Sequence, residues 1–154
     1  MAHDSDFVIA RIRCPKCGQE SDERLQVYLR DVDYGGEFKV GDAYAPDLDH
    51  LDVGYYVLRR PHAGEPLRVA VHTGCDACPY DYVWSRVILA DGVIRSTDGV
   101  VLDREVVDSL HVIDDILRAQ YRERGGVDLK TMSETDRAAY ILAHPPAELT
   151  PRES

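Results

Sequence analysis

Long apolar runs are missing from this chain of 154 residues. The longest, at positions 138–143, has six residues, whereas a helix that spans a bilayer needs about 20. The first six residues include two aspartates and no apolar stretch. We therefore expect neither a membrane-spanning helix nor a secretory signal peptide, and we expect a cytoplasmic protein.

Positive charge is also scarce. Lysine and arginine together number 18 against 28 aspartates and glutamates, which gives a formal net charge of −10. Binding to nucleic acid or to an anionic membrane surface needs a basic face, so neither is expected. The remaining composition is ordinary, with 44% hydrophobic residues, and a chain of this length can bury a core without disulfides.

The familiar catalytic signatures are absent as well. The sequence contains no G-x-S-x-G, no P-loop, no G-x-G-x-x-G and no H-E-x-x-H. It therefore gives no reason to assign catalysis to this chain by itself.

Four cysteines are present, and they form two pairs with the same C-x-x-C spacing. Cys14 and Cys17 make the first pair, Cys75 and Cys78 make the second, and 57 residues separate them. Each C-x-x-C turn points two thiolates at one ion, so two turns complete a tetrahedral zinc site. The pattern predicts one structural zinc ion bound by all four cysteines. A redox pair or two disulfides are the alternatives, but the first expects a βαβ setting and the second an oxidising compartment.

These two pairs resemble the knuckles of the zinc-ribbon, or rubredoxin-like, module over residues 7–19 and 69–95. The long separation implies an insertion between the knuckles. His72, three residues before the second knuckle, could replace a thiolate or donate to one, but a position beside the site or on the exposed surface is expected. The layout is also similar to the small zinc-containing subunits of acetone-carboxylase-type enzymes, which implies a role as a subunit.

Hydrophobic periodicity predicts an α+β fold with an antiparallel β zinc-ribbon domain at 1–100, a helical extension at 101–146 and a flexible tail at 147–154. Alternating or apolar runs indicate strands at 7–13, 24–30, 37–40, 53–59, 67–72, 82–90 and 93–96, the last two joined by an Asp-Gly turn. An i, i+4, i+7 stripe indicates one helix at 103–124, formed by Val106, Leu110, Ile113, Leu117 and Tyr121. Thr131 and Glu134 have the spacing of a capping box that opens a second helix, to about residue 143.

Several residues outside the cysteines are candidates for binding. Val107 and Ile116 widen the apolar face of the expected helix and are predicted to meet a protein partner or a second copy of the chain. Arg59 and Arg60 form a basic doublet that could meet an anionic group. Side chains at 80, 82 and 84 are aromatic and share one strand face, where they pack over the zinc site or stack on bases. The insertion carries potential hard-metal ligands, namely Asp42, Asp47, Asp49, His50 and Asp52.

The sequence therefore predicts a zinc-binding structural or accessory protein that acts through protein–protein interaction, as a small subunit of a larger assembly. The alternative is a nucleic-acid-associated zinc ribbon of the transcription type, because the basic residues Arg11, Arg13, Lys16 and Arg24 surround the first knuckle. A third alternative is an enzyme whose site lies in the insertion at 42–62.

Overall fold

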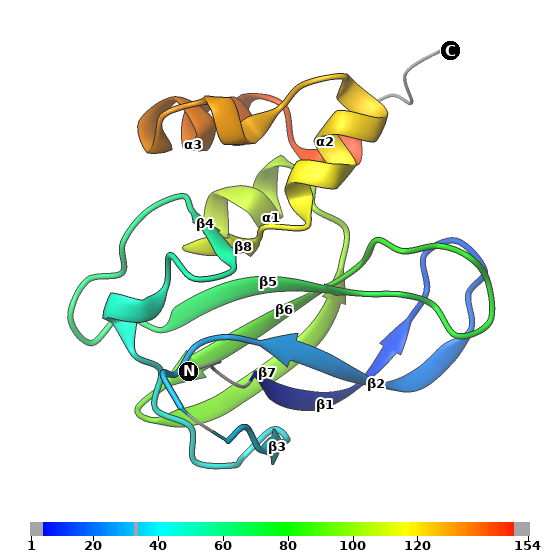
Figure 1. Ribbon diagram of the computed structural model, residues 1–154. Helices are drawn as coiled ribbons and strands as arrows, with labels where there is room; N and C mark the ends of the chain where they lie inside the picture. The colour runs from blue at the N-terminus through cyan, green and yellow to red at the C-terminus, as the bar shows by residue number, and fades with distance from the viewer. Residues whose placement is uncertain (1–4, 33, 150–154) are drawn as a thin grey trace.

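The computed structural model describes residues 5–32 and 34–149. Within these residues the chain forms eight strands in two sheets and three α-helices, so the predicted α+β class is confirmed. The helices lie together on one face of the larger sheet, and the smaller sheet lies on the opposite face (Figure 1). None of the described helices is both long and apolar enough to cross a membrane.

The smaller sheet has the strand order β2-β1-β3. Strands β1 (Asp6–Arg13) and β2 (Glu20–Val27) form an antiparallel hairpin whose register runs from Asp6 opposite Val27 to Arg13 opposite Glu20. The short β3 (Glu37–Phe38) pairs with β1 in parallel. The first cysteine pair lies at the tip of the β1–β2 hairpin.

The larger sheet has the order β4-β8-β5-β6-β7. Its strands are β4 (Tyr55–Val57), β5 (Leu67–Thr73), β6 (Val83–Ala90), β7 (Val93–Val100) and β8 (Val112–Asp114). The β6–β7 hairpin turns at Asp91 and Gly92, both with positive φ, as the Asp-Gly pair predicted. Strand β8 pairs in parallel with β5 and lies in the segment that was expected to be helical. Within the first hundred residues the expected antiparallel pairing is wrong only for β3, which pairs in parallel with β1.

Two cores separate the three layers. Because side chains alternate along a strand, Val69 and Val71 of β5 face the smaller sheet, whereas Ala70 between them faces the helices. The smaller sheet contributes buried residues from β1 and β2, among them Val8, Ile12, Leu25 and Val27. The second core, between the larger sheet and the helical layer, contains Ile113 of the sheet together with buried residues that include Leu102, Val107, Leu110, Leu117, Tyr121, Leu129 and Ile141.

The single helix predicted at 103–124 is wrong. The segment folds as α1 (Arg104–Ser109), then β8, then α2 (Leu117–Gly125). Leu110 has an extended backbone, and the amide of His111 donates to the carbonyl of Arg68 at 3.0 Å. Pairing with β4 and β5 satisfies the backbone of β8 and outweighs the helical pattern of its side chains. Four members of the stripe are nevertheless buried, since Leu110, Ile113, Leu117 and Tyr121 are at most 1% exposed, whereas Val106 is half-buried.

The helix ends follow local capping rules. Asp103 accepts from the amide of Val106 and caps α1, and Gly126, with φ of 69°, ends α2. Helix α3 (Glu134–Ala143) is capped by Ser133, whose hydroxyl accepts from the amide of Asp136, and not by Thr131 as the capping-box pattern predicted. The described residues also form three 3-10 turns, at Leu48–His50, Leu129–Thr131 and Pro146–Glu148. Of the predicted tail, residues 150–154 lie outside the described residues.

Candidate metal centre

The two cysteine pairs, far apart in the sequence, meet in space. Cys14 and Cys17 come from the turn between β1 and β2, and Cys75 and Cys78 come from the turn between β5 and β6. All four sulfurs lie within 4.8 Å of one another. The centre therefore joins a hairpin tip of the smaller sheet to a hairpin tip of the larger one.

The sulfur spacing fits one tetrahedral ion. The Sγ atoms of Cys14 and Cys78 are 3.8 Å apart, and those of Cys17 and Cys75 are 3.6 Å apart. A tetrahedron with metal–sulfur bonds of about 2.3 Å has edges of about 3.8 Å. A disulfide would need about 2.0 Å, and all four cysteines are free thiols. The four sulfurs can hold one metal ion, as the sequence predicted.

Backbone amides support the sulfurs in the same way in both knuckles. The amides of Lys16 and Ala77 donate to the sulfur of the cysteine two residues before each, at 3.4 and 3.3 Å. Each turn closes through a bond from its first cysteine amide, to the carbonyl of Gln19 or of Tyr80. The second knuckle therefore reaches the geometry of the first without an equivalent of Gly18, which has φ of 77°.

The thiols influence one another's ionisation. Burial opposes ionisation of Cys14, but amides of Cys17 and Lys16 favour its thiolate, and its pKa is lowered to about 7. The amide of Tyr80 favours the thiolate of Cys78, yet burial and the sulfur of Cys75 oppose it, and that pKa is raised to about 12. One negative charge in the cluster therefore discourages the next. A bound dication would stabilise all four thiolates together.

His72 lies on β5 but takes a different partner from the one expected. Its Nδ1 is 2.7 Å from a carboxylate oxygen of Asp114 on β8, and its ring lies edge-on to Trp84. It does not belong to the group of metal-ligating atoms. The structure thus gives His72 a carboxylate partner in place of a thiolate.

The other candidate residues are dispersed. Arg59 pairs with Glu65 at 3.4 Å, and Arg60 pairs with Asp52 at 3.0 Å. Val107 is completely buried in the second core, which corrects the expectation that its side chain meets a partner. Ile116 is half-buried against that core.

Two carboxylates of the insertion accept hydrogen bonds from nearby backbone amides. Asp42 accepts from the amide of Lys39, and Asp47 accepts from the amide of Asp49. Across residues 5–32 and 34–149, the four cysteines are the one group of three or more potential ligands close enough to hold a metal. The structure therefore gives no support to a second metal site in the insertion.

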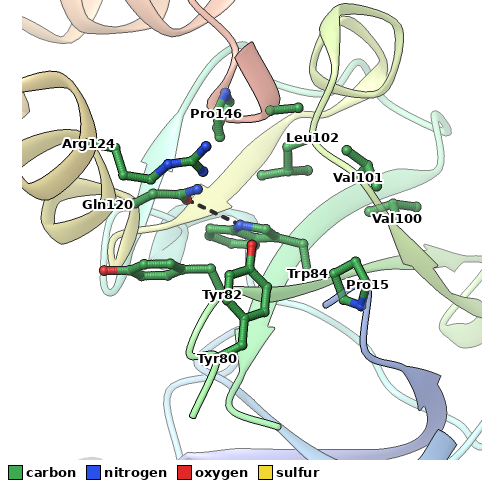
Figure 2. Close-up of a pocket in the computed structure, with 11 residues that line it drawn as sticks. Pro15, Tyr80, Tyr82, Trp84, Val100, Val101, Leu102, Gln120, Arg124 and Pro146 are labelled. Carbon is green, nitrogen blue, oxygen red and sulfur yellow. Dashed lines mark hydrogen bonds between the residues drawn. The ribbon is translucent and has the colours of Figure 1, made fainter. Parts of the chain in front are cut away.

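The aromatic residues after the second knuckle line a pocket beside the metal centre (Figure 2). Trp84 is buried against the helical layer, and its indole Nε1 donates to Oε1 of Gln120 at 3.3 Å. The rings of Tyr80 and Tyr82 meet edge-to-face. Packing beside the four-cysteine site and in the core is thus what the structure shows, in agreement with the interpretation that the sequence favoured. Gln120 and Arg124 also line this pocket, and no sequence pattern indicated this. Both residues fall within the single long helix predicted at 103–124, which placed them on no particular side of the sheet.

Comparison with known proteins gives no match, whether to a protein family, to a characterised protein or to a solved structure.

Proposed function

We propose that this chain is a zinc-folded accessory protein that acts by binding another protein, as a small subunit of a larger assembly. The cluster of four sulfurs carries the proposal. A zinc ion held by four thiolates has no open coordination position, so it stabilises a fold and leaves no place for a substrate. Here the ion would fasten the tip of one sheet to the tip of the other.

Exposed apolar side chains on the insertion support a protein partner. Leu48 and Val53, at either end of a short segment around the first 3-10 turn, are 44% and 45% exposed. Contiguous exposed apolar groups mark contact sites, and we propose these two residues, five positions apart in the sequence, as part of such a site. The similarity of the layout to small subunits of acetone-carboxylase-type enzymes supports a multi-subunit enzyme as the assembly.

The charges around the first knuckle favour protein over nucleic acid. Arg11 pairs with Asp22 at 3.4 Å, and Arg24 pairs with Glu37 at 2.9 Å. Arg13 lies 3.9 Å from Glu20. Arginines that already face carboxylates offer little net charge to a phosphate backbone, and the whole chain carries −10.

The test is to purify the tagged chain from its own cells and to measure its mass by light scattering. The expected result is a complex larger than the free chain, which Leu48→Asp combined with Val53→Asp dissociates while the zinc content stays the same. Val40→Asp, at a residue 48% exposed outside the insertion, is the matched control and should leave the complex intact. A wild-type chain that elutes as a free monomer would overturn the proposal.

A further inference from the structure

The pocket beside the metal centre has the features of a small-molecule site. It has a volume of about 160 Å³ and is formed where the first knuckle, the start of β6, the end of β7 and helix α2 meet. A cavity of about 150 Å³ is enough to hold benzene. Its size therefore suits a single six-membered ring.

The walls of the pocket are aromatic and apolar. Trp84 lies at its centre, with Tyr80 and Tyr82 on one side and Leu102 and Pro146 on another (Figure 2). The apolar part is completed by Pro15, Val100, Val101 and Ala147. A planar ring could stack on these aromatic side chains and would lose little hydrogen bonding when it leaves water.

Two polar groups of α2 converge on the same space. Gln120 is 2% exposed, and its Oε1 is occupied by the indole of Trp84. Among the described residues no hydrogen bond involves the Nε2 of Gln120, and this nitrogen is not one of the fully buried atoms that lack a partner, so it is an amide donor that is open to the pocket.

Arg124 supplies the charge. Among the described residues that line the pocket, it is the one with a formal charge, and one of its five N–H groups donates to the carbonyl of Leu149. The neighbouring acid, Glu123, accepts from the hydroxyl of Tyr82 at 2.6 Å. The guanidinium therefore keeps free donors that match a carboxylate.

We propose that this pocket binds a small aromatic monocarboxylate of about the size of benzoate. The ring lies against Trp84 and its aromatic neighbours, and the carboxylate accepts from Gln120 Nε2 and the Arg124 guanidinium. Because Pro15 and Tyr80 belong to the two knuckles, the metal centre fixes part of the wall.

Trp84 is the only tryptophan of the chain, so its fluorescence reports on the pocket directly. The experiment titrates the zinc-loaded protein with benzoate and, as a neutral ring, with benzyl alcohol. We expect saturable benzoate binding, with amide shifts in nuclear magnetic resonance spectra confined to the pocket residues. Losing a charged hydrogen bond in Arg124→Gln should weaken benzoate about 10- to 100-fold, with little change for benzyl alcohol.

Gln120→Glu is the sharper variant. It keeps an acceptor for the indole of Trp84 but replaces the amide donor with a carboxylate that repels the ligand, so benzoate binding should be lost. Arg95→Gln, at the exposed Arg95–Asp91 pair on the β6–β7 hairpin, is the control and should bind as the wild type does. Melting temperatures check that each variant folds. Absence of saturation in the wild type, or equal benzoate affinity in all three variants, would overturn the proposal.

Discussion

Asp6 holds the densest buried polar network of the described chain, and its removal gives a quantitative test of the fold. Its side chain is 1% exposed and accepts two hydrogen bonds from Arg30, at 2.8 and 2.6 Å. It also accepts from the hydroxyl of Tyr44 at 2.6 Å and from the amide of Gly36 at 3.0 Å. The network ties the start of β1 to the loops on either side of β3.

Asp6→Asn keeps the shape of this side chain but removes its charge and half of its accepting capacity. Breaking a buried ion pair costs about 3–5 kcal/mol of unfolding free energy. Arg30 is 28% exposed and can regain some hydration, so we expect the lower end, about 3 kcal/mol. With an m-value of about 2 kcal/mol per molar urea, the unfolding midpoint should fall by about 1.5 M.

The assay is urea unfolding followed by Trp84 fluorescence, with Asp22→Asn as the matched control. Asp22 pairs with Arg11 on the surface, where its side chain is 70% exposed, so its loss should cost at most about 1 kcal/mol. If Asp6→Asn lowers the free energy of unfolding by less than about 1 kcal/mol, the inference that this buried ion pair stabilises the fold is wrong.

The pH dependence of the same variant gives a second check. Burial opposes ionisation of Asp6, but the bonds from Arg30, Tyr44 and Gly36 outweigh it and hold its pKa below the ordinary value of 3.8. The contribution of this carboxylate is therefore complete above about pH 4 and is lost as the pH falls through its lowered folded pKa. The difference between the wild type and Asp6→Asn should shrink at acid pH.

Three further predictions concern the core and the partner. Burial lowers the pKa of His111, although its bond to Glu65 opposes this effect. Because the unfolded state binds the proton more readily than the folded state, the stability of the fold should decrease as the pH drops below about 6.5. His111→Gln should remove that slope from urea midpoints measured between about pH 7 and pH 5. Val107→Asp should lower the free energy of unfolding by about 3 kcal/mol or more, measured by thermal melting, because its side chain is completely buried. Ile116→Asp changes a half-buried side chain and should lower it clearly less. Equal losses in the two variants would contradict this difference in burial. Fluorescence anisotropy should detect no binding to duplex DNA tighter than about 10⁻⁶ M at physiological salt, and a submicromolar, steeply salt-dependent affinity would favour the nucleic-acid alternative.

The metal centre was the most predictable feature, because its information is local. C-x-x-C spacing fixes the turn, and the Asp-Gly pair fixes the β6–β7 hairpin, through residues next to each other in the sequence. The strands of the first hundred residues were likewise predicted to within a few residues, with β2 displaced toward the first knuckle and β4 shorter than expected.

The region after residue 100 was less predictable, since its structure depends on distant partners. Leu110, Ile113 and Leu117 have helical spacing, yet β8 interrupts the helix because β4 and β5 offer it backbone hydrogen bonds. Short apolar segments are compatible with either a helix or a strand, and only the sheet decides between them. For the same reason the pocket could not be predicted from the sequence. Its Gln120–Trp84 hydrogen bond forms because α2 begins only after β8 and so brings Gln120 close to Trp84.

Metal analysis of the purified protein, combined with X-ray absorption at the metal edge, determines whether the four cysteines hold zinc. We predict one zinc ion per chain with four sulfur neighbours at about 2.3 Å, and loss of that ion in Cys17→Ser. Zinc-free protein with disulfides at Cys14–Cys17 and Cys75–Cys78 would contradict it. Iron with the same four sulfur ligands would keep the site but contradict zinc as its metal.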